Sequence, residues 1–203
     1  MKLNKIEFMI MNNPLRALIQ EKYELKILRA MSSIKNIETA LEIGCGNGNG
    51  TKVIKKYFSP KNIIAIDLDE KMIEIAQRRN KDTSVTYKVM DASKLDFPNN
   101  HFDAVFDFGI IHHIPNWKDC IQELKRVLKP NAEVILEELS IDTFSKGIGR
   151  VWRKILDHPY QQMYSAKQFI EFMTETGFEI KNYKESNPLK LIRHFSLNAI
   201  IRK

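Results

Sequence analysis

The sequence of 203 residues has few of the features that define several large protein classes. Its two cysteines, Cys45 and Cys120, are too few for a disulfide framework or a cysteine-based zinc site, and we predict no metal site. No run approaches the roughly 20 apolar residues that span a bilayer, and the first residues lack the apolar core and cleavage site of a signal peptide. With 43% hydrophobic and 28% charged residues, the composition is that of a globular protein. We expect one cytoplasmic domain over residues 1–203.

The net charge of +7 is unevenly distributed along the chain. Residues 1–36 carry +4, residues 37–144 carry −3 and residues 145–203 carry +6. Basic flanks around a near-neutral middle indicate either an anionic partner, attracted by the local potential, or an ordinary lysine-rich solvated surface. The charge pattern alone leaves both interpretations open.

Short β-rich runs alternate with amphipathic helical segments through the middle of the chain. We expect strands at residues 37–43, 62–67, 84–89, 102–108 and 133–139, and helices at 15–31, 70–80, 117–128 and about 165–176. Alternation of this kind predicts βαβ units and a parallel sheet covered on both faces. Two later runs, 178–185 and 194–203, alternate apolar and polar residues as an antiparallel pair would. The predicted fold is therefore α/β: a Rossmann-like, doubly wound, seven-stranded sheet, mostly parallel, with an antiparallel C-terminal edge strand and helices on both faces.

A glycine-rich loop at residues 44–50 follows the first expected strand. Glycines allow a sharp turn and a close approach to a ligand, and the N-terminus of the next helix presents its N–H groups there. The dinucleotide spacing G-x-G-x-x-G is absent, because Asn49 or Thr51 stands at the third glycine position, and no P-loop lysine follows. Glu42, two residues before the loop, would repel a pyrophosphate but suits a ligand that carries an ammonium or sulfonium charge.

The segment from Glu42 through the loop has the pattern E/D-x-G-x-G-x-G, and further motifs follow in order over residues 37–140. They are Leu68-Asp69, Phe102-Asp103-Ala104-Val105, His112-His113 and the run Arg-Val-Leu-Lys-Pro at 126–130. In these motifs the chain resembles the class I S-adenosylmethionine-dependent methyltransferases, and most of all the small-molecule group called methyltransferase type 11. The family usually follows this last motif with Gly-Gly, where this chain has Asn131-Ala132. Asn tolerates the left-handed backbone conformation, so we interpret the change as structural.

The resemblance implies that S-adenosylmethionine is the cofactor and S-adenosylhomocysteine the product. It assigns the methionine part of the cofactor to the glycine loop with Glu42, the ribose to Asp67, and the adenine to residues after the second and third strands. The fourth strand ends where the methyl group meets the acceptor. The implied cofactor-binding residues are Glu42, Gly44, Cys45, Gly46, Gly48, Asp67, Leu68, Met72, Asp91, Ala92, Phe108 and Gly109.

Three side chains are candidates for a catalytic base: His112 and His113 after the fourth strand, and Glu138 at the end of the fifth. Histidine has a pKa suited to this role. A base is required only when the acceptor arrives protonated, since holding the acceptor in line with the S–CH₃ bond supplies about 7–11 kcal/mol by itself. A purely structural role for the histidines is the alternative.

Substrate choice in the family depends on segments outside the cofactor-binding core of residues 37–140. Here these are the N-terminal helical extension, 1–36, and the insertion at 141–166; the last helix and C-terminal strands occupy 167–203. Residues 146–156 combine apolar and basic side chains at helical spacing around Trp152, as expected of either a lid helix or a peripheral membrane contact. The candidate substrate-binding residues are Arg16, Arg150, Trp152, Tyr160 and Tyr164.

The partner expected from these features is a small apolar or amphiphilic molecule. Nucleic acid is not expected, because the fourth strand ends in Asp107-Phe108-Gly109-Ile110 and lacks the Asn/Asp-Pro-Pro-aromatic motif of enzymes that methylate base or glutamine amino groups. Two rival hypotheses remain: an RNA- or protein-directed methyltransferase, which only the basic flanks support, and a non-catalytic protein that binds S-adenosylmethionine. The sequence specifies neither the accepting atom nor the oligomeric state.

Overall fold

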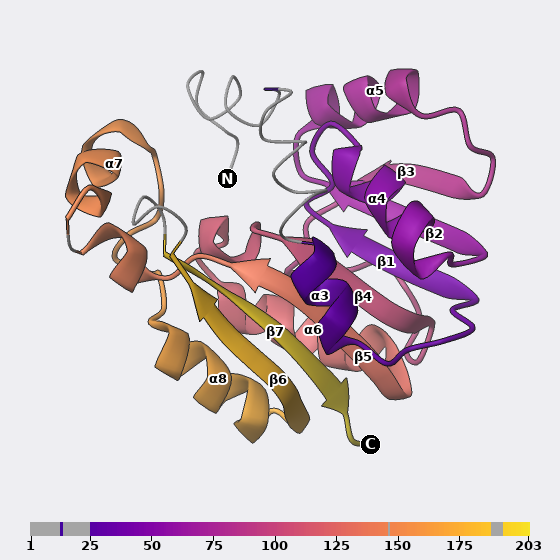
Figure 1. The fold of residues 1–203 in the computed structure, drawn as a ribbon. Helices are drawn as coiled ribbons and strands as arrows, with labels where there is room; N and C mark the ends of the chain where they lie inside the picture. Colours follow the sequence, from indigo (N-terminus) through magenta and orange to yellow (C-terminus); the bar gives the residue numbers. More distant parts are fainter. Residues whose placement is uncertain (1–12, 14–24, 146, 188–192) are drawn as a thin grey trace.

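The computed structural model describes residues 13, 25–145, 147–187 and 193–203 (Figure 1). These residues form a seven-stranded sheet in the order β3-β2-β1-β4-β5-β7-β6. The strands are β1 (Thr39–Ile43), β2 (Asn62–Asp67), β3 (Val85–Val89), β4 (Phe102–Phe108), β5 (Leu128–Glu138), β6 (Phe178–Ser186) and β7 (His194–Ile201). The predicted α/β fold is confirmed.

The direction of each strand follows from its pairing. Strands β3, β2, β1, β4 and β5 pair in parallel, whereas β7 pairs antiparallel with both β5 and β6. The reversed strand is therefore β7, second from the edge, and β6 lies outside it. The sheet changes winding direction between β1 and β4, and in sheets of this type ligands bind at such a switch point, beyond the carboxyl ends of the strands.

Helices cover both faces of the sheet, as predicted (Figure 1). One core cluster packs α6 (Trp117–Val127) and α8 (Ala166–Glu175) against the sheet. The other packs α3 (Leu25–Met31), α4 (Asn49–Phe58) and α5 (Glu70–Arg79). Two short 3₁₀ helices, η2 (Ile111–His113) and η3 (Ile141–Phe144), and the helix α7 (Gly149–Ile155) are the remaining elements of the described residues. Of the helix expected at 15–31, only residues 25–31 lie within the described part.

Local sequence explains where the elements begin and end. In α6, Trp117, Cys120, Ile121, Leu124 and Val127 are buried at the spacing of one helix face. Helix α8 begins with a capping box between Ser165 and Gln168 and is followed by Gly177 at φ 102°. Asn131 has φ 63°, so the residue that replaces the family's glycine does adopt the left-handed conformation. Among the described residues, no helix combines the length and the apolar character that crossing a membrane requires.

Candidate functional site

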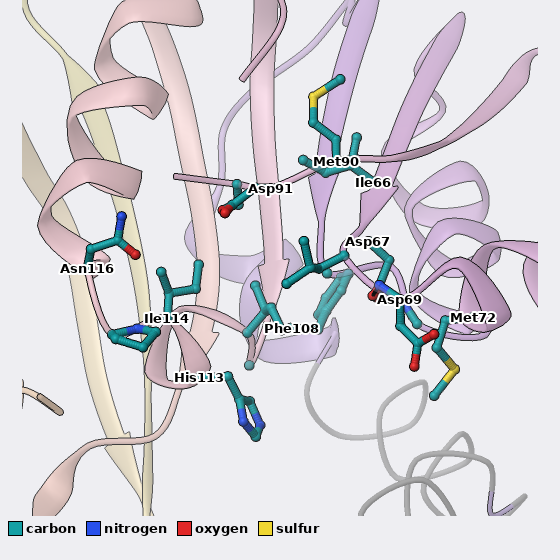
Figure 2. Close-up of a pocket in the computed structure, with 17 residues that line it drawn as sticks. Ile66, Asp67, Asp69, Met72, Met90, Asp91, Phe108, His113, Ile114 and Asn116 are labelled. Carbon is teal, nitrogen blue, oxygen red and sulfur yellow. Dashed lines mark hydrogen bonds between the residues drawn. The ribbon is translucent and has the colours of Figure 1, made fainter. Parts of the chain in front are cut away.

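A pocket lies at the carboxyl ends of β1, β2, β3 and β4, at the switch point of the sheet (Figure 2). Asp67, Asp69 and Met72 gather on one side, His113, Ile114 and Asn116 on the other, with Phe108 between them. The lining residues are Gly44, Gly46, Ile66, Asp67, Leu68, Asp69, Met72, Met90, Asp91, Ala92, Phe108, Gly109, Ile110, His113, Ile114, Pro115 and Asn116. Nine of the twelve residues assigned to the cofactor by resemblance are in this lining.

The glycine loop forms one wall of the pocket in a conformation that needs glycine. Gly44, Gly46 and Gly48 have φ values of 64°, 51° and 81°, all in the left-handed region that side chains disfavour. A Cβ at Gly44 would also collide with the side chain of Ile110, so this glycine allows the loop to approach the connection after β4. Gly48 then serves as the N-cap of α4.

Asp67, at the end of β2, connects the loop to the next strand. Its carboxylate accepts hydrogen bonds from the N–H of Gly46 at 2.8 Å and from the N–H of Asp69 at 2.9 Å. Burial raises the pKa of Asp67, while these two backbone bonds lower it. Each carboxylate oxygen has more than one acceptor site, so both oxygens remain able to accept from a ligand diol.

Asp91 and Ala92 follow β3 and line the pocket beyond Asp67. Asp91 is exposed, and its Oδ1 accepts from the N–H and the hydroxyl of Ser93 at 2.8 and 2.7 Å. These bonds fix the orientation of the carboxylate, and the apolar side chains of Leu68 and Met72 line the same pocket.

Glu42 lies beneath the glycine loop and outside the pocket lining. It is 1% exposed, and the hydroxyl of Thr51 in α4 donates a hydrogen bond to it. The pKa of Glu42 is raised to about 8, mainly by burial and also by the nearby Asp67 and Asp107, while the hydrogen bond from Thr51 lowers it. A Cβ on Gly50 would collide with its carboxylate. The position of Glu42 is therefore that of a support for the loop and for the start of α4.

Cys45 and Gly48 also lie outside the lining, although the resemblance assigns both to the cofactor. The side chain of Cys45 points into the core cluster with α3, α4 and α5, and it is 5% exposed. Burial raises the pKa of its thiol well above the usual value, so it stays protonated.

Of the three candidate bases, only His113 lines the pocket. Glu138 is 1% exposed and belongs to a buried hydrogen-bond network. It accepts from His112 Nδ1 at 2.7 Å, from the N–H of Ile111 at 2.6 Å and from the hydroxyl of Tyr164 at 2.9 Å. Burial raises the pKa of Glu138 to about 7. The network holds η2, and with it His113, at the end of β4.

The four candidate substrate-binding residues within the described part of the chain do not line this pocket. Tyr164 is 1% exposed and is bound to Glu138. Arg150 donates from Nε to the carbonyl of Ser145 at 3.1 Å, and the hydroxyl of Tyr160 donates to the carbonyl of Leu156 at 3.1 Å. Trp152 lies on α7, and Arg16 falls outside the described residues. Residues 141–166 reach the pocket indirectly, because His158 packs against His113.

Several lining residues were not predicted from the sequence. Ile66, Asp69 and Met90 are chain neighbours of predicted residues, and proximity to a strand end was the signal that would have found them. Ile110, Ile114, Pro115 and Asn116 flank the histidine pair after β4. His158 is 45 residues from His113 in sequence, and no periodicity connects the two.

The part of the chain that forms this site is similar to a known protein family. Residues 41–136, which contain most of β1, the whole of β2, β3 and β4, most of β5 and the whole pocket lining, match the model of a methyltransferase domain. This match identifies residues 41–136 as a methyltransferase domain of the type 11 group, as the sequence motifs predict.

Similar proteins include methyltransferases that act on different small molecules. Phosphoethanolamine N-methyltransferase 2 of Caenorhabditis elegans is 31% identical over 160 residues, which are 76% of this chain and 35% of that protein. Demethylmenaquinone methyltransferase of Staphylococcus carnosus is 26% identical over 82% of this chain and 70% of its own length. The chain thus spans about a third of the first relative. A solved S-adenosylmethionine-dependent methyltransferase of Aquifex aeolicus has the same fold, with a TM-score of 0.76, 21% identity, and coverage of 98% of this chain and 100% of that one.

The cofactor of this methyltransferase family is S-adenosylmethionine, and the pocket has donors and acceptors of the right kind for it. Close approach at Gly44 and Gly46 suits the narrow methionyl chain, the Asp67 carboxylate suits a cis-diol, and the apolar side chains beside Asp91 suit a purine. The pocket residues therefore fit the group that the family binds.

Proposed function

We propose that this chain transfers the methyl group of S-adenosylmethionine to a small apolar or amphiphilic acceptor. The single observation that carries the proposal is the pocket at the switch point, which is lined by three acids, Asp67, Asp69 and Asp91, and by the apolar side chains that follow β4. In this arrangement Asp67 binds the ribose, Asp91 and Ala92 bind the adenine, and the loop at Gly44 and Gly46 holds the methionyl chain.

The acceptor then lies on the side of Phe108, Ile110, His113 and Ile114. In the transfer, the accepting atom forms a bond to the methyl carbon while the S–CH₃ bond breaks, and the sulfur keeps the electron pair. Positive charge at sulfur is neutralised as the step proceeds, so a site that holds the acceptor in line and excludes water is sufficient. Burial lowers the pKa of His113 well below its usual value, so the imidazole stays neutral and is a weak base, suited to orienting an acceptor by a hydrogen bond.

The relatives support a small acceptor but differ in its chemistry. One is named for phosphoethanolamine and another for demethylmenaquinone, a polar and an apolar molecule respectively. The lining of the acceptor side of this chain favours the apolar or amphiphilic type, because Phe108, Ile110, Ile114 and Pro115 contribute most of it.

Helix α7 offers a way to reach an amphiphilic acceptor, and we infer a peripheral contact with an anionic lipid surface. Ile148, Val151 and Ile155 recur at the spacing of one helix face and are 40%, 53% and 40% exposed. The exposed basic residues Arg150, Arg153 and Lys154 lie beside them. Exposed aliphatic side chains next to basic ones are the composition of an interfacial helix.

The test of function is transfer of label from methyl-labelled S-adenosylmethionine into a fractionated cell extract, with metabolites, lipids, RNA and protein counted separately. We expect label in the lipid or apolar metabolite fraction, and expect it to disappear in the presence of added S-adenosylhomocysteine. Label in RNA or protein would support the rival hypothesis of a macromolecular substrate. Binding of S-adenosylmethionine without label in any fraction would support a non-catalytic binding protein.

A further inference from the structure

Three histidines from two distant parts of the chain meet beside the pocket. His112 and His113 belong to η2, and His158 lies between α7 and α8. All three are buried, with exposed fractions of 4%, 7% and 8%. Their ring centroids are 4.3 Å apart for His112 and His113, 4.4 Å for His113 and His158, and 5.1 Å for His112 and His158. Among the described residues, this is the cluster of His, Cys, Asp or Glu side chains whose geometry suits a metal ion.

We propose that His112, His113 and His158 form a binding site for a divalent transition metal of the zinc type, next to the acceptor side of the pocket. One nitrogen of each imidazole lies within 4.8 Å of the others. In a tetrahedral zinc site with Zn–N bonds of about 2.0–2.1 Å, ligand nitrogens are separated by about 3.4 Å. The Nδ1 atoms of His113 and His158 are 3.2 Å apart, so this pair already has the spacing of two ligands.

The third ligand requires only a small adjustment. All three nitrogens lie within 4.8 Å of one another, so no separation has to shorten by more than about 1.4 Å to reach the tetrahedral value. Rotation of one imidazole about its χ torsions provides a movement of this size without displacement of the backbone. The ligand set of three imidazoles is one that zinc, cobalt, nickel and copper share.

Glu138 supplies the outer partner that histidine ligands usually have. Its Oε2 is 2.7 Å from His112 Nδ1, which leaves Nε2 as the atom of His112 that would coordinate the ion. A carboxylate in this position orients the ring and increases its basicity. Tyr164 and the N–H of Ile111 in turn hold Glu138, so the orientation of His112 is fixed before any ion binds.

The buried carboxyl of Glu138 contacts His112 from outside the cluster of three imidazoles. A single ion bound to all three rings would link the segment that contains His158 to η2, and so fix residues 141–166 against the pocket.

The experiment uses the full chain with any affinity tag removed, freed of metal with a chelator and then dialysed. Titration with Co²⁺ is followed by visible d–d absorption, and titration with Zn²⁺ by calorimetry. We expect one equivalent of either ion, the intense visible bands of tetrahedral cobalt, and a dissociation constant below about 10 µM. His158→Ala should weaken Zn²⁺ binding by at least about tenfold. His101→Ala is the matched control, because His101 stacks near Phe97 and lies outside the cluster, and its affinity should equal that of the wild type.

A variant that keeps a ligand guards against loss of folding. His158→Cys should retain Co²⁺ binding and add a thiolate-to-cobalt charge-transfer band. The proposal is overturned by the absence of Zn²⁺ binding to the folded wild type up to about 100 µM, or by equal affinity in the wild type and His158→Ala. The readouts are metal binding and absorption spectra, so a negative result would reject the metal site without rejecting the proposed methyl transfer. Conversely, a chain that binds the ion but transfers no methyl group would reject the proposed function and keep the metal site.

Discussion

The carboxylate of Asp67 accepts a hydrogen bond of 2.8 Å from the backbone N–H of Gly46. This contact connects the ends of β2 and β1 across the pocket wall. One acid thus performs two tasks: it holds the glycine loop in place, and it presents its remaining acceptor sites to the cofactor. Because the same carboxylate also binds the N–H of Asp69, its orientation is fixed by the backbone on both sides.

Replacement of Asp67 by Ala should weaken binding of S-adenosylmethionine by about 10- to 150-fold, since a lost hydrogen bond to a charged group costs roughly 1.5–3 kcal/mol. Isothermal titration calorimetry measures this directly. Asp82→Ala is the control, because Asp82 is an exposed acid in the turn before β3. Unchanged affinity in Asp67→Ala would remove Asp67 from the cofactor site.

Substitutions at two glycines of the same loop distinguish the cost of backbone strain from the cost of a steric collision. Gly44→Ala and Gly46→Ala both place a side chain at positive φ, at a cost of about 1–2 kcal/mol each. At Gly44 the new methyl group also meets the side chain of Ile110, whereas at Gly46 it meets nothing within 4 Å. Urea unfolding should show the larger loss of stability for Gly44→Ala. The double variant Gly44→Ala/Ile110→Gly, which removes the Cβ of Ile110 that the new methyl group meets first, should have a coupling energy that offsets part of that loss, and strict additivity would contradict the collision.

The buried carboxyl of Glu42 should make the protein less stable as pH rises. Its pKa is about 8 in the folded chain and 4.5 without the protein environment. The folded state therefore binds the proton more tightly, and the stability that the protonated group contributes below pH 4.5 is lost progressively up to pH 8. Between pH 5 and pH 8.5, the free energy of unfolding should therefore fall less in Glu42→Gln than in the wild type, by at least ~1 kcal/mol. Urea unfolding of both proteins at pH 5 and pH 8.5 tests it, and parallel pH profiles would count against it.

The hydroxyl of Tyr164 should contribute to stability through Glu138. Tyr164→Phe removes a donor from a buried carboxyl, at an expected cost of roughly 1.5–3 kcal/mol. Tyr160→Phe is the matched control, since its hydroxyl donates to the part-buried carbonyl of Leu156, a bond worth about 0.5–1.5 kcal/mol. A change in the Michaelis constant of the acceptor without loss of stability would instead support Tyr164 as a substrate-binding residue.

Helix α7 should bind anionic vesicles in preference to neutral ones. Each basic residue near such a surface contributes about 1 kcal/mol, so Arg150→Glu/Arg153→Glu should reduce partitioning by well over tenfold. Val151→Asp should reduce it by removing the most exposed apolar contact of the helix. Sedimentation with vesicles that contain phosphatidylglycerol measures both, with Lys35→Glu, an exposed residue outside α7, as the control for net charge. Equal sedimentation of all four proteins would leave α7 as a lid helix only.

The sequence by itself determined the fold class and most of the cofactor end of the pocket. Strands β2 and β4 have the predicted bounds, because short buried runs between turn residues are local signals. Glycines and acids at strand ends are local as well, and the parallel order of the sheet then brings Gly44, Asp67 and Asp91 to one edge. The residue types at the strand ends and the order of the strands were together sufficient to predict the cofactor end of the pocket.

Only the tertiary structure decided which side chains face the pocket and which support it. Three residues have side chains of the kind that catalysis uses, yet packing buries them behind the pocket lining: Glu42, His112 and Glu138. There Glu42 binds Thr51, His112 binds Glu138, and Glu138 holds η2 through the N–H of Ile111. The orientation of a side chain depends on the elements packed around it, and the insertion that carries Tyr164 and His158 has no strict periodicity that fixes its path. The contact between His158 and His113 joins residues 45 positions apart, so it exists only once the chain has folded.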